Sequence, residues 1–273
     1  MSSLRIGVTG CRGRMGRMIC AAVAETPGLV LAGGTVRPGD GDAGANLGAR
    51  LGLPDVTAPI LDDPAALFAR SDAVIDFTTP DLAAKHAQLA AQAGVTLVLG
   101  TTGLDAATQE AVQRAARHIA VVQAANTSLG VTLLLDLVRQ VARALDPAFD
   151  IEIQELHHRH KVDAPSGTAL ALGRAAAAGR GVDLDAVAER GRDGATGPRE
   201  TGDIGFAVLR GGDVPGEHTV VFAGPGERIE LTHKAGSRAI FAQGAVKAAL
   251  WAQQQNPGLF GMADVLGLTP HRS

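Results

Sequence analysis

Residues 4–16 read LRIGVTGCRGRMG, a short apolar run that leads into a glycine-rich turn. The apolar run predicts a strand over Leu4–Thr9, and the residues after the turn predict a helix over about Arg14–Glu25. The glycine spacing is G-x-x-G-x-x-G, in which Gly10 allows a tight turn, Gly13 admits a phosphate close to the backbone and Gly16 lets the helix pack closely. A strand, a glycine turn and a helix in this order are typical of a dinucleotide-binding loop, although a chain with 35 glycines also has glycine turns of other kinds.

The alternation of strand and helix continues along the next hundred residues. Four further apolar runs predict strands, and helices are predicted at about Asp81–Ala93 and Asp105–Arg117. These strands are Leu29–Thr35, Ala73–Phe77, Val95–Leu99 and Ile119–Gln123. Such units predict a doubly wound, Rossmann-like parallel sheet, whose ligands bind beyond the carboxyl ends of the strands. Residues 38–63 are rich in Gly, Asp and Pro and are predicted to form a long surface connection.

The second half of the chain follows a different pattern. A long helix over Leu129–Leu145 is predicted to lead into a second domain, and residues 179–203 are predicted to form a mobile loop. Three strand-like runs separated by glycine turns then favour an antiparallel sheet: Gly205–Arg210, His218–Phe222 and Arg228–His233. A helix over about Arg238–Gln254 closes the pattern. The fold class is therefore α/β, with a parallel nucleotide domain and an α+β domain that carries an open mixed sheet.

Composition excludes several classes of function. With 25 basic and 28 acidic side chains the net charge is −3, and aromatic residues make up only 3%, so a nucleic-acid partner is not expected. The chain enters a strand within five residues and has no apolar run of about 18 residues, which predicts a cytoplasmic protein without a membrane partner. Cys11 and Cys20 lack the spacing of metal ligands and are expected to be small buried hydrophobic residues.

Residues 155–168 read ELHHRHKVDAPSGT and carry most of the chemistry of the chain. Three of the eight histidines and one of the four lysines lie here, between a half-buried strand at 151–153 and a helix capped by Ser166. Histidine and lysine supply protons and positive charge, and a helix start binds anions, so this loop is predicted to hold and protonate a small anionic substrate. A metal site formed by His157, His158 and His160 is disfavoured, because adjacent residues on a strand point to opposite faces.

The run E-x-H-H-x-x-K-x-D-x-P-S-G-T-A over 155–169 resembles the signature of the 4-hydroxy-tetrahydrodipicolinate reductase (dihydrodipicolinate reductase) family. The similarity extends over nearly the whole chain through residues 10–16, 76–78, 100–103, 216–218 and 232–235. It implies a dinucleotide-binding domain of residues 1–128 and 239–273, and a substrate-binding and tetramerisation domain of residues 129–238. It also implies the NAD(P)H-dependent reduction of a small cyclic dicarboxylate, with loss of water, in diaminopimelate and lysine biosynthesis by a homotetramer.

The resemblance also implies roles for individual residues. His157 matches the family's proton donor or acceptor, Lys161 matches its proton donor, and His158, Gly167 and Thr168 match substrate-binding positions. Residues that match cofactor loops are Gly10, Cys11, Arg12, Gly13, Arg14, Met15, Gly100, Thr101, Thr102, Ala124, Ala125, Asn126 and Thr127, with Arg37 facing the NADP phosphate. No metal ligand is implied. His218 and His233 are expected to be structural.

Two departures from the family pattern bear on the cofactor. Val36 stands where many members have an acidic partner for the ribose, so with Arg37 beside it the chain is expected to prefer NADPH over NADH. Thr127 replaces the Phe of an Asn-Phe-Ser run next to the nicotinamide. Two other classes stay open: another two-domain NAD(P)-dependent dehydrogenase of amino-acid metabolism, and a non-catalytic NADPH sensor.

Overall fold

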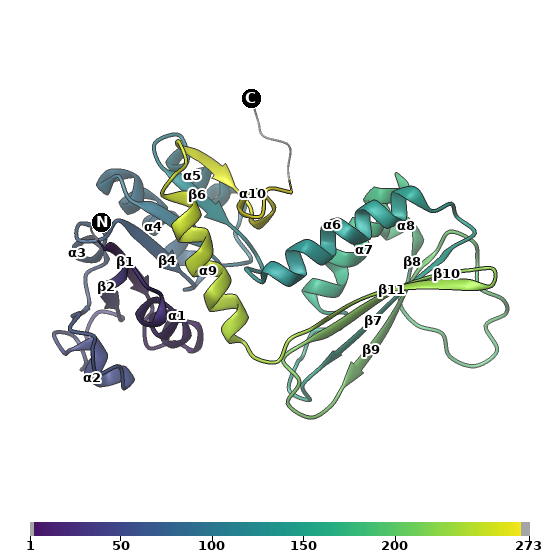
Figure 1. Ribbon diagram of the computed structural model, residues 1–273, viewed down its shortest axis with the longest axis horizontal. Coiled ribbons are helices and arrows are strands. Elements are labelled where there is room, and N and C mark those ends of the chain that lie inside the picture. Colours follow the sequence, from purple (N-terminus) through teal and green to yellow (C-terminus); the bar gives the residue numbers. More distant parts are fainter. Residues whose placement is uncertain (1–2, 269–273) are drawn as a thin grey trace. The chain divides into compact units, whose positions relative to one another are not determined.

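The computed structural model describes residues 3–268 and divides the chain into two compact units. One unit is built from the chain up to Ser128 together with the chain from Ala239 onward, and the other is Leu129–Arg238. Figure 1 shows that each unit has its own sheet and its own helices. The polypeptide therefore leaves the first unit once and returns to it with a late helix, α9 (Ala239–Ala252).

The first unit contains a seven-stranded sheet with the strand order β12-β6-β5-β4-β1-β2-β3. Every pairing in it is parallel, and its strands are β1 (Leu4–Thr9), β2 (Leu29–Thr35), β3 (Ile60–Leu61), β4 (Ala73–Asp76), β5 (Thr96–Leu99), β6 (Ala120–Gln123) and β12 (Gly258–Phe260). Central strands such as β4 and β5 are buried at every residue, as expected for a parallel sheet covered on both faces.

Helices cover both faces of this sheet. Helix α9 packs against α1 (Arg14–Glu25) and against β4, β5 and β6, while α4 (Pro80–Ala93) packs against α5 (Ala106–Ala115) and α3 (Pro64–Phe68). Leu97 and Leu99 belong to the core beneath α4 and α5, so the intervening residue of β5 faces the other layer. The predicted doubly wound parallel sheet is confirmed.

Strand β1 marks the point at which the strand order reverses. The chain passes from β1 through α1 to β2 on one side, whereas β4, β5 and β6 extend on the other side. In such sheets a crevice opens beyond the carboxyl ends of the strands at the reversal. The glycine turn after β1 and residues 77–79 after β4 stand at this crevice.

The second unit contains a five-stranded sheet with the order β11-β10-β7-β9-β8. Its strands are β7 (Asp150–His157), β8 (Ala188–Glu189), β9 (Ile204–Arg210), β10 (Glu217–Gly224) and β11 (Glu227–Lys234). Helices α6 (Leu129–Ala144), α7 (Gly167–Arg180) and the short α8 (Leu184–Val187) pack over one face around a core that includes Ile151, Ile153, Val220 and Phe222. Residues that point to the other face, including Gln154, Leu156, Thr219 and Val221, are partly or fully exposed.

The sheet of the second unit is mixed. Strand β10 pairs with both β7 and β11 in antiparallel fashion, but β9 runs parallel to β7 and β8 runs parallel to β9. The predicted mixed sheet is therefore confirmed, whereas the interpretation of the three late runs as antiparallel strands does not hold for the pairing of β9, which is parallel to β7. The chain between β7 and β9 crosses over through α7 and α8, and such a crossover returns the chain to the same edge in the same direction.

Two segments contain more structure than their composition predicts. Residues 38–63 include α2 (Leu47–Leu51) and β3, in which Leu47 and Ile60 are fully buried, so this segment is not merely a surface connection. Within residues 179–203 lie α8 and β8, and Arg199 binds Asp150 and Glu152 of β7 through ion pairs of 2.9 and 3.0 Å. The glycine and aspartate content of these two segments indicates loops. Isolated buried apolar residues and long-range ion pairs nevertheless give them regular structure.

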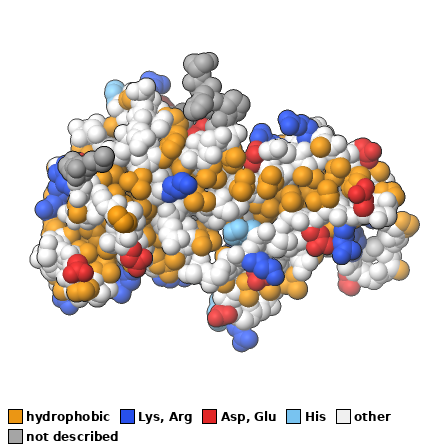
Figure 2. Space-filling view, viewed as in Figure 1, with side chains coloured by type: hydrophobic (Ala, Val, Ile, Leu, Met, Phe, Trp, Pro, Cys, Tyr) orange, Lys and Arg blue, Asp and Glu red, His pale blue; other side chains and the backbone are white. Residues whose placement is uncertain are grey.

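The surface offers no simple electrostatic signature. Figure 2 shows basic and acidic side chains interspersed over the visible face rather than gathered into a patch of one sign. Within residues 3–268, no helix combines the length and the apolar character that crossing a bilayer requires.

Helices α6 and α7 approach closely because α7 is rich in alanine and glycine. A Cβ atom at Gly179 would lie 2.4 Å from the carbonyl oxygen of Arg139 and 2.8 Å from the Cβ of Ala142, both on α6. Neither the helix backbone nor a short Ala side chain can move away from such a contact without separating the helices. Gly179 therefore fixes the distance between α7 and α6.

Overpacking usually costs about 1–3 kcal/mol, whereas alanine normally stabilises a helix interior by about 1 kcal/mol relative to glycine. We therefore expect Gly179→Ala to lower the free energy of unfolding by up to about 2 kcal/mol. Urea unfolding at fixed protein concentration measures the effect. Gly191→Ala is the matched control, because a Cβ at Gly191 meets no atom within 4 Å. Equal stability of the two variants would contradict a close contact at Gly179.

Candidate active site

Strand β7 carries a buried stripe whose last two members are polar. Ile151, Ile153, Glu155 and His157 alternate along the strand, and all four are buried on the face covered by α6 and α7. The two isoleucines belong to the core, whereas Glu155 and His157 continue the same stripe toward the end of the strand. An alternation of period two therefore places an acidic residue and a histidine side by side beneath the helices.

The Glu155 carboxylate is 1% exposed and has four hydrogen-bond donors around it. Its Oε2 accepts from His157 Nδ1 and from Arg210 at 2.8 Å, and its Oε1 accepts from Arg210 at 3.0 Å and from the backbone N–H of Ser166 at 2.9 Å. Burial would raise the pKa of Glu155, but the hydrogen bonds from Arg210, His157 and Ser166 outweigh burial and lower that pKa. Glu155 is therefore an ionised carboxylate inside the protein.

His157 lies at the end of β7 with its two nitrogens in different surroundings. Nδ1 meets Glu155, whereas Nε2 lies beside Gly216, where an added Cβ would come within 2.9 Å of it. The ring of His218, on the neighbouring strand β10, packs edge-on against His157 with a centroid separation of 5.1 Å. A side chain at position 216 would therefore press against the side of the ring that bears Nε2.

The loop after β7 returns the chain to α7 and holds the lysine. Lys161 Nζ binds the Asp163 carboxylate at 2.8 Å, which lowers the pKa of Asp163. His158 Nε2 lies 3.1 Å from the guanidinium of Arg238, and desolvation together with that positive charge lowers the pKa of His158, so its ring is neutral and Nε2 accepts the hydrogen bond. His160 is exposed, with its ring 6.3 Å from that of His158.

Helix α7 begins at Gly167, where the sequence predicts it. Ser166 is the N-cap, and its hydroxyl accepts from the backbone N–H of Ala169 at 3.1 Å. The same hydroxyl lies 3.2 Å from His218 Nε2. A Cβ at Gly167 would meet nothing within 4 Å, so the approach to the helix start is open. The positive end of the helix and the histidine loop therefore belong to one site in the second unit.

The glycine turn in the first unit has the geometry that the motif requires. Gly10 adopts a φ of 62°, and the N–H of Gly13 donates to the Gly10 carbonyl at 2.9 Å. A Cβ at Gly16 would lie 2.2 Å from that same carbonyl oxygen, so only glycine permits α1 to begin this close to the turn. The turn and the helix start form a cradle that suits a pyrophosphate.

The side chains of this turn have separate roles. Cys11 is fully buried beneath Gly34, and burial raises its thiol pKa to about 11, so only its backbone is available to a dinucleotide. Arg12 pairs with Asp40 at 2.8 Å and with Asp42 at 2.9 Å. Arg14 and Arg37 are exposed, and Met15, which follows Arg14 in α1, is half-buried.

The other predicted cofactor residues follow β5 and β6. Gly100 donates its N–H to the Asp76 carbonyl at 2.8 Å, and an added Cβ would overlap the Phe77 ring. The Thr101 hydroxyl is buried without a hydrogen-bond partner, as expected for an atom that meets a ligand. Thr102 and Ala125 are exposed, Ala124 and Asn126 half-buried, and Thr127 is buried with its hydroxyl donating to the Phe241 carbonyl at 2.7 Å. The cradle and the unsatisfied hydroxyl fit a bound dinucleotide.

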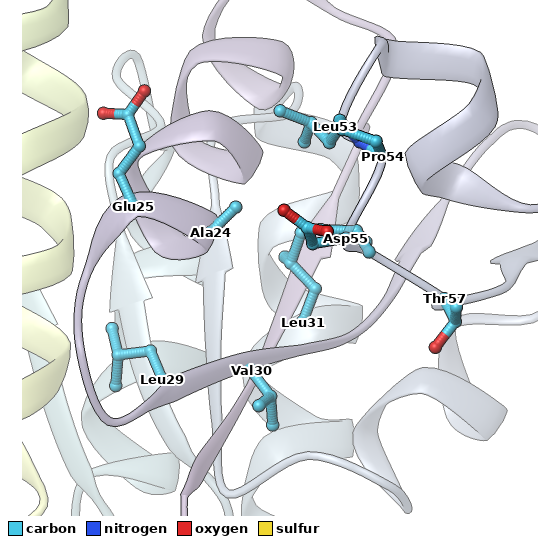
Figure 3. A pocket seen from close by; sticks show the side chains of 10 residues that line it. Ala24, Glu25, Leu29, Val30, Leu31, Leu53, Pro54, Asp55 and Thr57 are labelled. Atoms are coloured by element: carbon cyan, nitrogen blue, oxygen red, sulfur yellow. The ribbon is translucent and has the colours of Figure 1, made fainter.

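One pocket of the first unit lies away from these loops. It has a volume of about 340 Å³ and is lined by the C-terminal end of α1, the start of β2 and residues 53–57. Figure 3 shows Glu25, Leu29 and Leu53 around it. Because it lies at the amino end of β2, it is not at the edge of the sheet where cofactors of such folds bind. Among the described residues no group of three or more His, Cys, Asp or Glu could hold a metal ion.

Sequence reasoning assigned no role to three residues of the site. Glu155 stands in the motif, and its spacing of two from His157 already indicates a shared face of the strand. Arg210 and Arg238 come from β9 and from the end of the second unit, 55 and 80 residues from their partners Glu155 and His158. No local pattern identifies such distant partners.

Comparison with known proteins covers both units. The family model described as dihydrodipicolinate reductase, N-terminus, matches residues 4–127, and the model for its C-terminus matches residues 130–266. The 4-hydroxy-tetrahydrodipicolinate reductase of Rhodopseudomonas palustris (strain BisB18) is 55% identical over 98% of this chain and 99% of that protein. The enzyme of the same name from Dinoroseobacter shibae is 55% identical over 96% of this chain and 98% of its own length.

A solved structure agrees with the sequence comparisons. A dipicolinate-bound dihydrodipicolinate reductase from Paenisporosarcina sp. TG-14 superposes with a TM-score of 0.78 at 25% identity, over 96% of this chain and 98% of that one. Both family models match, and full-length relatives share more than half of their aligned residues with this chain. The chain belongs to the dihydrodipicolinate reductase family and is an oxidoreductase.

Proposed function

We propose that this protein reduces 4-hydroxy-tetrahydrodipicolinate to tetrahydrodipicolinate, with loss of water, in the diaminopimelate route to lysine. The observation that carries the proposal is the loop of His157 and Lys161 beside the start of α7, in a chain whose two halves match this family. The first unit binds the nicotinamide dinucleotide and the second binds the substrate. A non-catalytic sensor would have no use for a buried carboxylate that holds a histidine.

The substrate is a small cyclic dicarboxylate, like the dipicolinate in the related solved structure. One carboxylate docks at Gly167 and Thr168, where the positive end of α7 and an open approach favour an anion. His158 and Arg238 supply further polar contacts and positive charge from the adjoining loop. These contacts hold the ring in one orientation within the second unit.

His157 and Lys161 carry the proton chemistry. The nicotinamide, when bound, supplies a hydride to a ring carbon, and the electron pair displaced from the conjugated system needs a proton. The Lys161 ammonium stabilises the negative charge that develops and donates that proton, while His157 donates or accepts a proton at its Nε2. Elimination of water removes the 4-hydroxyl group together with a proton from the neighbouring ring carbon, and one hydride and one proton complete the reduction.

His218 lies beside His157 but does not share its role. Burial, followed by the nearby positive charge of His157, lowers the pKa of His218 to about 4. At neutral pH its ring is uncharged, and its Nε2 shares a hydrogen bond with the Ser166 hydroxyl that caps α7. His218 therefore acts as a structural support of the helix start.

The preferred cofactor is NADPH. Val36, at the end of β2, is 9% exposed and offers no carboxylate to a ribose, whereas Arg37 is exposed. No ion pair of Arg37 is found among residues 3–268, whereas the nearby Arg12 is already neutralised by Asp40 and Asp42. Arg37 is thus available to form charge-assisted hydrogen bonds with a 2′-phosphate.

The subunits associate through the second unit. One face of its sheet is covered by α6 and α7, but residues on the other face, such as Leu156 and Val221, remain partly exposed. A sheet face of this kind is normally covered by another layer, and the same face of a second subunit supplies one by symmetry. We expect a homotetramer. Light scattering at micromolar concentration checks this, and a monomer would contradict it.

For the catalytic pair, we expect His157→Ala and Lys161→Ala each to lower kcat by about 10²–10⁴, the usual range for general acid–base groups. Cofactor affinity should remain unchanged, because the dinucleotide binds in the other unit. Thr168→Val should instead raise KM more than it lowers kcat, as for loss of a positioning contact. Steady-state kinetics with enzymatically prepared substrate, together with cofactor titration, measure these effects.

The control for the lysine variant is Lys85→Ala, which removes an exposed lysine from α4 in the other unit. It should leave kcat and KM unchanged. Near-normal kcat in both the His157 and the Lys161 variants would assign the loop a structural role only.

For the cofactor, we expect Arg37→Ala to weaken NADPH binding by about 1.5–3 kcal/mol, the net value of a hydrogen bond to a charged group, and to leave NADH binding nearly unchanged. Fluorescence titration of both cofactors checks this. Arg117→Ala, which removes an exposed arginine after α5, is the charge-matched control. An equal loss for both cofactors would mean that Arg37 only shapes its loop.

A further inference from the structure

We infer that Glu155 is a positioning residue for proton transfer: locked by Arg210, its carboxylate fixes the His157 ring with Nε2 toward the substrate and ties the start of α7 to the same point. The inference rests on the proposed function, in which His157 exchanges a proton with the substrate. It adds Glu155 and Arg210 to the site as positioning residues.

The first observation is the asymmetry of the His157 ring. A carboxylate only accepts hydrogen bonds, so Nδ1 must carry a proton where it meets Glu155. In the neutral ring the other nitrogen, Nε2, then holds the lone pair, and in the protonated ring Nε2 holds the transferable proton. Nε2 is the nitrogen that lies beside Gly216, where a Cβ would come within 2.9 Å of it. The two contacts select one tautomer and one orientation.

The second observation is the way in which Arg210 holds Glu155. Two guanidinium nitrogens contact the two carboxylate oxygens at 2.8 and 3.0 Å, a bidentate pair that is planar and directional. Arg210 also donates to the Asp163 carbonyl at 2.6 Å, two residues beyond Lys161. The arginine therefore keeps the carboxylate charged and fixes its plane, and it anchors the loop that carries Lys161.

The third observation links this carboxylate to the docking end of the helix. Glu155 Oε1 accepts from the backbone N–H of Ser166, the N-cap residue, while Oε2 accepts from His157. Ser166 directly precedes Gly167 and Thr168. A single carboxylate thus sets the distance between the proton-transferring ring and the helix start, and a displacement of about 1 Å in such a distance can cost about 10²-fold in rate.

The charge of Glu155 also faces the ring. The titratable and charged groups near His157 are Glu155 on β7, Arg210 on β9, His218 on β10 with His233 beside it on β11, and His158, Lys161 and Asp163 in the loop, where Asp163 pairs with Lys161. Glu155 is the carboxylate that bonds to the ring, so a substitution that removes its charge changes the surroundings of the proton that His157 carries.

The decisive variant is Glu155→Gln, which keeps the size of the side chain and removes its charge. We expect kcat to fall about 10–10³-fold with a smaller change in KM, and the kcat–pH profile to differ from that of the unsubstituted protein. In the His157→Ala background the same substitution should have almost no further effect on kcat, because the two residues act as one unit. Arg210→Gln should resemble Glu155→Gln, and Arg210→Lys should recover part of the loss.

The matched control is Asp72→Asn. Asp72 also accepts a bidentate arginine, Arg5, and a backbone N–H, but it lies in the first unit and meets no histidine among residues 3–268. This variant should leave the pH profile in place. Circular dichroism and thermal unfolding establish that all variants are folded.

A readout without turnover separates this inference from the proposed function. In protein labelled with ¹⁵N-histidine, the His157 signals, assigned by their absence in His157→Ala, should show a protonated Nδ1 and a free Nε2 in the neutral ring. Glu155→Gln should mix the two tautomers. If the unsubstituted protein lacks reductase activity, the proposed function is wrong, but the His157 tautomer can still be measured. An unchanged tautomer and pH profile in Glu155→Gln, or an additive loss in the double variant, would overturn the inference.

Discussion

The buried ion pair between Glu155 and Arg210 is the constraint on which the second unit depends. The Glu155 side chain lies on the buried face of β7, where Ile151 and Ile153 carry apolar side chains, and it is 1% exposed. Loss of one partner from a buried pair of this kind typically costs about 3–5 kcal/mol, because the other charge is left uncompensated. The pair joins β7, β9 and the start of α7, so the sheet, the crossover and the helix must form together for the charge to be satisfied.

The first unit depends on backbone geometry rather than on a charge. Its strands are buried over their whole length, and its loops contain glycines at the places where a side chain would overlap a carbonyl oxygen or a ring, as at Gly16 and Gly100. A parallel sheet brings the carboxyl ends of its strands to one edge, and these loops follow β1 and β5 there. The two units thus differ in what they present, which is a backbone cradle in the first and a cluster of titratable side chains in the second.

The sequence predicts elements well where the apolar period is long and the ends carry glycine, proline or a cap. The bounds of β1, α1 and β2 agree with the prediction, and so does the cap at Ser166. The prediction from sequence fails where a segment is ordered by contacts with residues distant in the chain. Strand β9 pairs parallel to β7 because of the crossover between them, and the buried Ile60 belongs to β3, which pairs with β2. In the site, the histidines and the lysine stand in one motif, whereas Arg210 reaches Glu155 from 55 residues away.

Thr127 illustrates how a departure from the family pattern is accommodated. The smaller side chain turns inward, where its hydroxyl binds the Phe241 carbonyl of α9, and a Cβ at Gly244 would lie 1.8 Å from the Thr127 carbonyl oxygen. The loop after β6 is therefore pinned directly to α9, the helix with which the chain returns to the first unit. A buried hydroxyl needs such a partner, and a glycine on α9 is required for the backbone to come this close. The Thr127 side chain is consequently bound to the helix, and it fixes the backbone of the loop after β6.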